Sequence, residues 1–277
     1  MTDKKNMTLP ECKTLLLRHE RAVLHVTLNR PEVRNALNHA MVTELNTVFD
    51  AAKQMGPEAV RAVVLRGAGR HFCAGADLKE MLASGMAPPK PGETDPLVSF
   101  NRGFGTMLRK VTDLPCVVIA VCEGAVLAGG FGFACVSDIA LAQVDAKFGV
   151  PETTRGLPPA QIAPFIVERI GLTQARRLCL TGAQFRGIDA LKLGIVHYVF
   201  ADEAELQERL LDLLQQVLSC APHANAVTKE IVVNSTRRPL DKVLDDAAQK
   251  FAACVRSAEA PEGIQAFMQK RAPKWVL

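Results

Sequence analysis

Two glycine-rich turns about fifty residues apart, and one carboxylate after them, are the residues best suited to chemistry. The first turn lies in residues 71–81, around Gly75, and the second in residues 123–138, around Gly129. A glycine turn that opens a helix presents free backbone N–H groups at the positive end of the helix dipole. Two such turns can direct two N–H groups at one oxygen. This pattern indicates an oxyanion hole, which stabilises a carbonyl whose negative charge grows in a transition state.

Each turn also has a plainer interpretation when it is taken alone. Glycine and aspartate are common where a strand connects to a helix. The glycines that follow Ala128 are equally consistent with close helix packing, although each costs roughly 1 kcal/mol relative to alanine inside a helix. Small residues at both turns would let a ligand approach the backbone closely.

The carboxylate is Glu152, in the segment KFGVPETTRG of residues 147–156. A carboxylate can take a proton from water as the water oxygen adds to one carbon, and then give a proton to the neighbouring carbon. It can also move a proton from one carbon to another, which is isomerisation. Its apolar neighbours, among them Phe148, Val150 and Leu157, predict that desolvation raises its pKa. The alternative is a surface glutamate that happens to follow a proline.

The elements that must position these residues alternate between strands and helices up to about residue 200. Apolar patterns predict strands over residues 24–28, 60–66, 117–122 and 139–142. Short helices are expected over 78–82 and 130–136, and Phe104, Leu108 and Val111 suggest another helix face. From Asn38 a helix is expected whose buried face consists of Met41, Leu45, Val48, Phe49 and Ala52,. The alternation predicts an α/β fold class.

After Ala201 the chain is predicted to be helical only, over residues 204–218, 225–234, 240–256 and 262–270. We therefore expect an α/β core over residues 1–200 and a C-terminal helical region over residues 201–277. Amphipathic helices of this kind often form an oligomer interface, and packing onto their own core is the plainer alternative. Residues 84–96 hold four prolines and two glycines, which predicts a surface loop,.

Composition excludes several other functions. The net charge of +4 in 277 residues is too weak to indicate nucleic-acid binding,. No apolar run approaches the roughly 18 residues of a membrane span, and the N-terminus has no signal-type stretch. The eight cysteines form no C-x-x-C pair and the six histidines are scattered, so we expect no metal and a reducing, cytoplasmic location,. Histidines at strand ends are interpreted as structural residues.

Taken together, the two turns and Glu152 resemble the crotonase family, also called the enoyl-CoA hydratase/isomerase superfamily. The resemblance covers nearly the whole chain, and its other segments are residues 28–31, 35–37, 180–182, 190–196 and 263–271. It implies a crotonase-type spiral of ββα turns with a C-terminal helical region. It also implies assembly as a homotrimer or as a hexamer made of two trimers.

The resemblance further implies an acyl-CoA substrate, with no cofactor beyond the coenzyme A of that substrate. The backbone N–H groups of Ala76 and Gly129 would form the oxyanion hole, and Glu152 would be the acid and base. The implied path of coenzyme A is lined by Ala74, Asp77, Leu78 and Lys79. Arg34, and less so Arg30, would meet phosphates or be solvated. Phe267 and Lys270 would reach the coenzyme A of a neighbouring subunit.

One departure from the family pattern bears on the reaction. Hydratases of the family use a second glutamate at the third residue after Gly129, where this chain has Gly132. Glycine cannot hold or protonate a water molecule. Either Glu152 works alone, or another group substitutes, or the reaction is not hydration.

A finer resemblance comes from Leu-Pro-Pro-Ala-Gln over residues 157–161, with residues 134–138 and 270–275. These segments resemble the isohexenylglutaconyl-CoA hydratases of acyclic terpenoid catabolism, next to the 3-methylglutaconyl-CoA hydratases of leucine breakdown. Gln161 would position water or bind a carboxylate. Arg155 is a candidate partner for the second carboxylate of such a substrate, and a solvated arginine is the alternative.

Three functions therefore remain open from the sequence. The first is hydration of a branched α,β-unsaturated acyl-CoA, and the second is double-bond isomerisation with Glu152 alone. The third is a CoA-thioester binding protein with little activity. Replacing Glu152 by alanine would separate the third function from the two enzymes.

Overall fold

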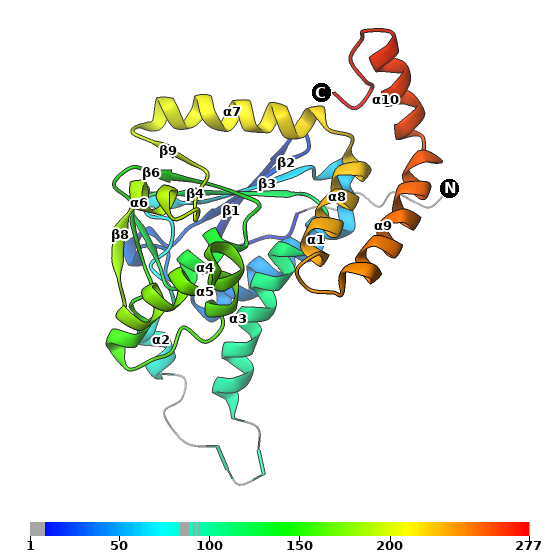
Figure 1. The fold of residues 1–277 in the computed structure, drawn as a ribbon. Helices are drawn as coiled ribbons and strands as arrows, with labels where there is room; N and C mark the ends of the chain where they lie inside the picture. Colours follow the sequence, from blue (N-terminus) through cyan, green and yellow to red (C-terminus); the bar gives the residue numbers. More distant parts are fainter. Residues whose placement is uncertain (1–8, 84–88, 91, 94, 277) are drawn as a thin grey trace.

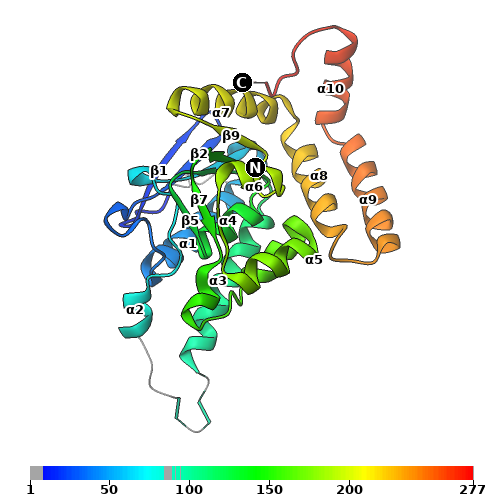
Figure 2. The same cartoon turned by 60° about the vertical axis from the view of Figure 1, so that its left-hand side comes forward.

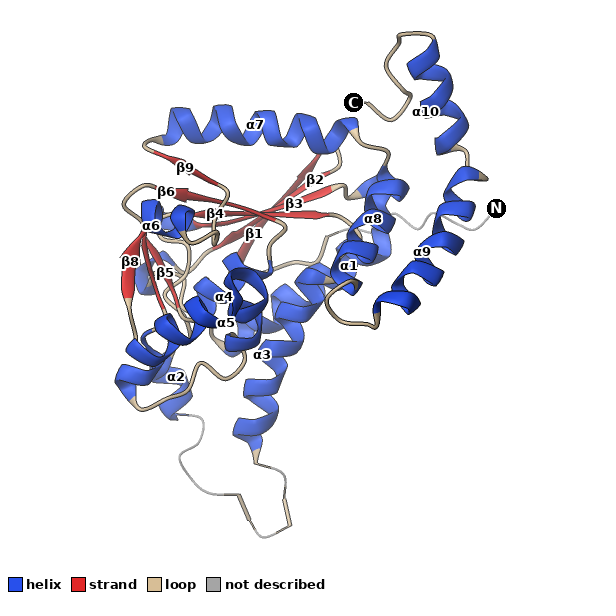
Figure 3. Ribbon diagram, viewed as in Figure 1, coloured by secondary structure: helices blue, strands red, loops and turns tan. Residues whose placement is uncertain are grey.

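The computed structural model describes residues 9–83, 89–90, 92–93 and 95–276, and shows an α/β core followed by helices (Figures 1 and 3). Within these residues the larger sheet has six strands in the order β1-β2-β3-β4-β6-β9. β1 pairs antiparallel with β2, and the other neighbours are parallel. The strands are β1 Leu15–Glu20, β2 Val23–Leu28, β3 Ala62–Gly67, β4 Val117–Cys122, β6 Ile139–Gln143 and β9 Tyr198–Phe200.

A smaller sheet explains the spiral. In the described chain it consists of β5 (Ala125–Leu127), β7 (Lys147–Gly149) and β8 (Gln184–Arg186). One turn of the chain runs through β4, β5 and α4 (Gly129–Val136), and the next through β6, β7 and α5 (Ala163–Thr181). Each turn gives one strand to each sheet and then a helix. The predicted ββα spiral is thus confirmed.

The helix expected after Asn38 is α1, His39–Ala59, and its buried face consists of the five predicted residues. The Asn38 side chain caps it by accepting the Met41 N–H at 2.9 Å,. The four predicted strands appear as β2, β3, β4 and β6. The two expected short helices appear as α2 (Leu78–Ala83) and α4, and the helix face of Phe104, Leu108 and Val111 belongs to α3 (Pro96–Thr112).

The sequence interpretation missed the three-residue strands β5, β7, β8 and β9, because so short a run carries no measurable alternation,. It also left out the six-residue strand β1, and the helices α5 and α6 (Gly187–Lys192). The predicted loop over residues 84–96 falls partly on residues 84–88, 91 and 94, which lie outside the described residues.

After residue 201 the described chain is helical, as predicted. The helices are α7 (Glu203–Ser219), α8 (Pro222–Asn234), α9 (Leu240–Val255) and α10 (Glu259–Met268). α7 covers one face of the larger sheet through Leu206, Leu210, Leu213 and Val217. The C-terminal region is thus partly joined to the core, while α9 and α10 lie away from it (Figure 2). Buried Arg61 links the two parts, because it donates to the carbonyls of Leu218 and Trp275.

No helix of the described residues combines the length and the apolar character needed to cross a bilayer.

Candidate active site

The two glycine turns meet in the structure. Leu37 pairs with Ala76 in an isolated bridge and donates its N–H to the Gly75 carbonyl at 2.8 Å. Gly75 has a φ of +95°, and a Cβ there would lie 2.6 Å from the Ala128 Cβ and 3.6 Å from the Gly129 nitrogen. Position 75 therefore accepts only glycine without movement, and the first turn lies against the start of α4.

The second turn is held by its own hydrogen bonds. The Ala128 N–H donates to the Gly149 carbonyl and the Ala128 carbonyl accepts from Gly132, both at 3.0 Å. Ala128 itself has a positive φ of 51°, a rare conformation for a residue with a side chain and one that clusters at functional sites,. No local sequence pattern predicts this backbone conformation.

The predicted oxyanion donors fall where the prediction requires. The N–H groups of Ala76 and Gly129 have no acceptor within the described part of the chain. Both residues line one cavity, together with Glu152. Two unused backbone donors and one carboxylate are therefore brought to the same space, and their catalytic roles stay a prediction.

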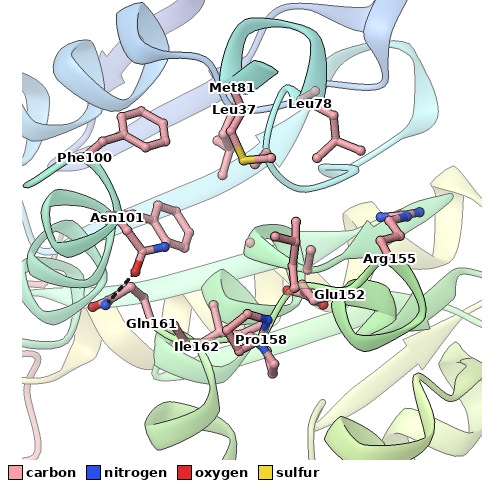
Figure 4. Close-up of a pocket in the computed structure, with 18 of the residues that line it drawn as sticks. Leu37, Leu78, Met81, Phe100, Asn101, Glu152, Arg155, Pro158, Gln161 and Ile162 are labelled. Carbon is pink, nitrogen blue, oxygen red and sulfur yellow. Dashed lines mark hydrogen bonds between the residues drawn. The ribbon is translucent and has the colours of Figure 1, made fainter. Parts of the chain in front are cut away.

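The cavity has a volume of about 550 Å³ and is mostly apolar (Figure 4). Among the described residues that line it, Glu152 and Arg155 are the ionisable ones, and Asn101 and Gln161 are the uncharged polar ones. Its apolar lining consists of Ala36, Leu37, Val42, Ala74, Ala76, Leu78, Met81, Leu97, Phe100, Phe104, Ala128, Leu157, Pro158, Pro159, Ala160 and Ile162.

Glu152 lies on the short 3₁₀ helix η3, Pro151–Arg155. Its Oε2 atom is buried and has no hydrogen-bond partner within the described residues. Burial raises the pKa of this carboxyl above its usual value, as its apolar neighbours predicted, and the Arg155 charge partly opposes the shift,. Thr153 anchors η3 to α5, because its Oγ1 donates to the Cys179 carbonyl at 3.1 Å. A carboxylate whose Oε2 atom has no hydrogen-bond partner, and whose pKa is raised in an apolar cavity, suits general acid–base catalysis.

Gly132, the departure from the two-glutamate pattern, has a structural reason. A Cβ at this position would lie 2.6 Å from the Ile162 Cγ2 and 3.2 Å from the Leu108 Cδ1. Ile162 is 3% exposed and belongs to the main core cluster. Its side chain thus fills the space through which a glutamate at position 132 would have to pass, so glycine is required there.

Replacing Gly132 by alanine is expected to destabilise the fold by about 1–3 kcal/mol, because the new Cβ overpacks against Ile162. The free energy of unfolding from urea titration measures this. In a double-mutant cycle, Ile162→Ala should relieve the clash, so that the paired variant is less destabilised than the sum of the two.

The matched control for this cycle is Gly103→Ala. Gly103 lies in α3 with nothing within 4 Å of the position of its Cβ, so alanine should be neutral or slightly stabilising there,. If the effects of the Gly132 and Ile162 changes simply add, Ile162 is not the obstacle.

A polar pair lies on the cavity wall. Gln161 donates from Nε2 to the Asn101 Oδ1 at 2.8 Å, joining the segment after η3 to α3 (Figure 4). Gly105, one turn further along α3, makes room for it, since a Cβ there would lie 2.0 Å from the Gln161 Oε1. Gln161 was predicted as a site residue. Asn101 was missed, although a lone amide between Phe100 and Phe104 is the signal that could have shown it.

Only part of the predicted coenzyme A path lines the cavity. Ala74 and Leu78 do, whereas Lys79 and Arg34 are exposed outside it. Asp77 is not a lining residue, since its carboxylate pairs with the Arg30 guanidinium at 2.9 Å and accepts the N–H groups that open α2.

The ion pair with Asp77 also holds the Arg30 side chain in position. This arginine also donates to the Ala36 carbonyl at 2.7 Å. Arg30 therefore braces the first turn beside the segment around Leu37, and its contact with a phosphate stays a prediction.

Phe267 lies in the last turn of α10 (Figure 1) and Lys270 follows the end of that helix, and neither residue lines this cavity. Phe267 is 85% exposed. Their predicted role concerns the coenzyme A of a neighbouring subunit, so it stays a prediction.

Two of the histidines are structural, as interpreted from the sequence. The Nδ1 of His71 accepts the Ala125 N–H at 3.1 Å, and the Nδ1 of His197 accepts the Ala140 N–H at 3.0 Å. Each fixes a strand of the core next to a turn.

Comparison with known proteins agrees with this architecture. A family model described as enoyl-CoA hydratase/isomerase matches residues 18–276. The solved structure of an enoyl-CoA hydratase/isomerase from Marinobacter aquaeolei superposes with a TM-score of 0.92, at 51% identity over 96% of this chain and 100% of that one. Pseudomonas aeruginosa AtuE superposes with a TM-score of 0.90, at 50% identity over 96% and 100%. The 2,3-dehydroadipyl-CoA hydratase of Escherichia coli is 31% identical over 264 residues, which is 94% of this chain and 97% of the relative.

Proposed function

The chain belongs to the enoyl-CoA hydratase/isomerase family, and on that premise we propose that it hydrates an α,β-unsaturated acyl-CoA with Glu152 as its acid and base. The observation that carries the proposal is the buried Oε2 atom of Glu152, which has no hydrogen-bond partner within the described residues and shares one cavity with two unused N–H donors. The protein is a crotonase-superfamily enzyme, and activity on acyl-CoA thioesters is the family-level function.

The proposed reaction needs only groups of this chain and water. Glu152 takes a proton from water as the water oxygen forms a bond to C3. The electron pair of the double bond moves toward the thioester oxygen. The N–H groups of Ala76 and Gly129 stabilise that enolate oxygen. Glu152 then returns the proton to C2, on the face to which the oxygen was added, so the addition is syn.

The proposed substrate is a branched, 3-substituted glutaconyl-CoA of the isohexenylglutaconyl type, with a role in acyclic terpenoid catabolism. Support comes from the volume of the cavity and from its apolar lining, which suit a branched hydrocarbon group,. The Escherichia coli relative is named for 2,3-dehydroadipyl-CoA, which also carries a second carboxylate.

The test compares crotonyl-CoA and 3-methylglutaconyl-CoA by loss of the enoyl-thioester absorbance. Hydration in ¹⁸O-labelled water should place the label on C3 of the product. Faster turnover of the branched diacid supports the substrate assignment. Equal or faster turnover of crotonyl-CoA contradicts it, and turnover of neither contradicts hydration.

Isomerisation with a single glutamate is the second candidate function. Gly132 and the Ile162 side chain favour it, because they leave no room for the second glutamate of the hydratases. A β,γ-unsaturated acyl-CoA would then gain conjugated absorbance without uptake of ¹⁸O. Such a gain, with no labelled alcohol from any enoyl-CoA, would replace hydration as the function.

The pH dependence of kcat/KM should show the raised pKa of Glu152. The carboxylate must be ionised to accept a proton from water, so activity is lost as pH falls through the pKa of the free enzyme. Because burial raises that pKa, the midpoint of the acidic limb should lie above the ordinary glutamate value of about 4.3,. A midpoint at or below this value would contradict the role of Glu152 or the desolvation.

Self-association as a trimer or hexamer is part of the proposal. Apolar side chains exposed on α9 and α10 support it, among them Leu244, Phe251, Ile264, Phe267 and Met268,. Light scattering after size exclusion should give a mass of three or six times 30.0 kDa. A monomer would leave Phe267 and Lys270 without the proposed neighbour.

A further inference from the structure

Arg155 is an exposed residue that lines the same apolar cavity as Glu152, and its charge acts on that carboxylate. Its guanidinium makes no hydrogen bond and no ion pair within 4 Å to any residue in the described part of the chain. By contrast, Arg30 on the other side of the first turn is fully engaged by Asp77 and Ala36. A guanidinium at the wall of an apolar cavity whose N–H groups make no hydrogen bond to the protein is available to an anionic ligand.

The position of Arg155 relative to Glu152 follows from the 3₁₀ helix. The two residues are at i and i+3 in η3, and side chains with this spacing eclipse one another in a 3₁₀ helix, roughly 6 Å apart along its axis,. Figure 4 shows both side chains at the cavity, with Asn101 and Gln161 on the other side of Glu152. An anion that contacts Arg155 would therefore lie close to the carbon that Glu152 serves.

The positive charge of Arg155 would reduce the repulsion between Glu152 and a carboxylate of the substrate. A second carboxylate brought near the ionised Glu152 would be repelled, and the repulsion is stronger in an apolar surrounding than in water. A guanidinium beside both groups offsets it. The amide pair of Asn101 and Gln161 carries no net charge and cannot do this.

We infer that Arg155 binds a carboxylate carried on a short branch of the acyl group, next to the carbon that receives water, and so selects diacid thioesters. The inference rests on the proposed function of this cavity. Arg155 is a specificity-determining residue in this assignment, and the charge on the substrate is what it recognises.

The experiment measures binding and turnover separately. Binding uses 3-methylglutaryl-CoA, which is saturated and unreactive, and the methyl ester of its free carboxyl group. The Kd ratio of ester to acid is measured by calorimetry for the wild type, Arg155→Leu and Arg155→Lys. We expect the ratio to fall about 10–100-fold in Arg155→Leu, the range for one charged hydrogen-bonded contact, and less in Arg155→Lys.

Arg176→Leu is the matched control. Arg176 is an exposed arginine on α5 that makes no hydrogen bond or ion pair within the described chain and does not line the cavity, so the ratio should match the wild type. The corresponding kcat/KM ratio, with 3-methylglutaconyl-CoA and its methyl ester, should follow the Kd ratio.

The outcomes separate the inference from the function on which it rests. An unchanged Kd ratio in Arg155→Leu overturns the inference whatever the turnover, and a loss of acid preference in Gln161→Ala instead would assign the carboxylate to the amide pair. An Arg155-dependent Kd ratio with no hydration of any enoyl-CoA would support the inference and remove the proposed function.

Discussion

Replacing Glu152 by glutamine is expected to lower kcat for hydration by about 10²–10⁴-fold, the range that general acid–base catalysis supplies. Glutamine keeps the shape of the side chain but cannot take a proton from water. The structure shows no second carboxylate in the described lining of the cavity that could substitute. KM should change much less than kcat, because coenzyme A affinity does not depend on this proton transfer.

The control for this change is Glu208→Gln, at an exposed position on α7 outside the cavity, which should keep wild-type kcat. Stopped-flow absorbance at saturating substrate measures kcat for both variants. A Glu152→Gln enzyme within a few-fold of wild type would remove Glu152 from the mechanism and favour water activation by another group.

Replacing Gly75 by alanine is expected to lower kcat by about 10²–10³-fold, as loss of one oxyanion donor does. The new Cβ would lie 2.6 Å from the Ala128 Cβ, at a backbone φ of +95° that alanine rarely adopts. The two turns must then move apart, and the N–H groups of Ala76 and Gly129 no longer converge on one oxygen. Steady-state kinetics with the preferred enoyl-CoA provides the measurement.

The matched control is Gly56→Ala, since Gly56 also has a positive φ of +81° but has nothing within 4 Å of its Cβ position. It carries the backbone strain without a contact with the second turn. Equal losses of kcat in the two variants would mean that strain alone, and not displacement of the turns, explains the Gly75 result. Circular dichroism and thermal unfolding would show that both variants are folded.

Much of the fold could be predicted from local patterns. The buried face of α1, five residues spaced at helical intervals, is correct residue by residue. Four strands and the change to helices after residue 201 were also correct, because amphipathic spacing is a property of neighbouring residues,. Three-residue strands such as β7 could not be found, since their pairing depends on partners far away in the chain.

Part of the candidate site could also be predicted from local patterns, and the rest depends on contacts between distant segments. Glu152 and the two glycine turns are visible in the sequence, because glycine, small residues and an apolar surrounding are local features. The ion pair of Arg30 was not predicted, because its Asp77 partner lies 47 residues away. Asn101 was missed for the same reason, since its Gln161 partner lies 60 residues away.

The sequence alone therefore predicted which residues would carry the chemistry, namely a carboxylate in apolar surroundings and two turns with free N–H groups. Only the tertiary structure decided that Gly75 touches Ala128 and that the Ile162 side chain occupies the space beside Gly132. Periodicity and turn chemistry act within a few residues, whereas these contacts join segments that are brought together only when both sheets close around one core. The departure at Gly132 thus reflects the packing of this chain around Ile162.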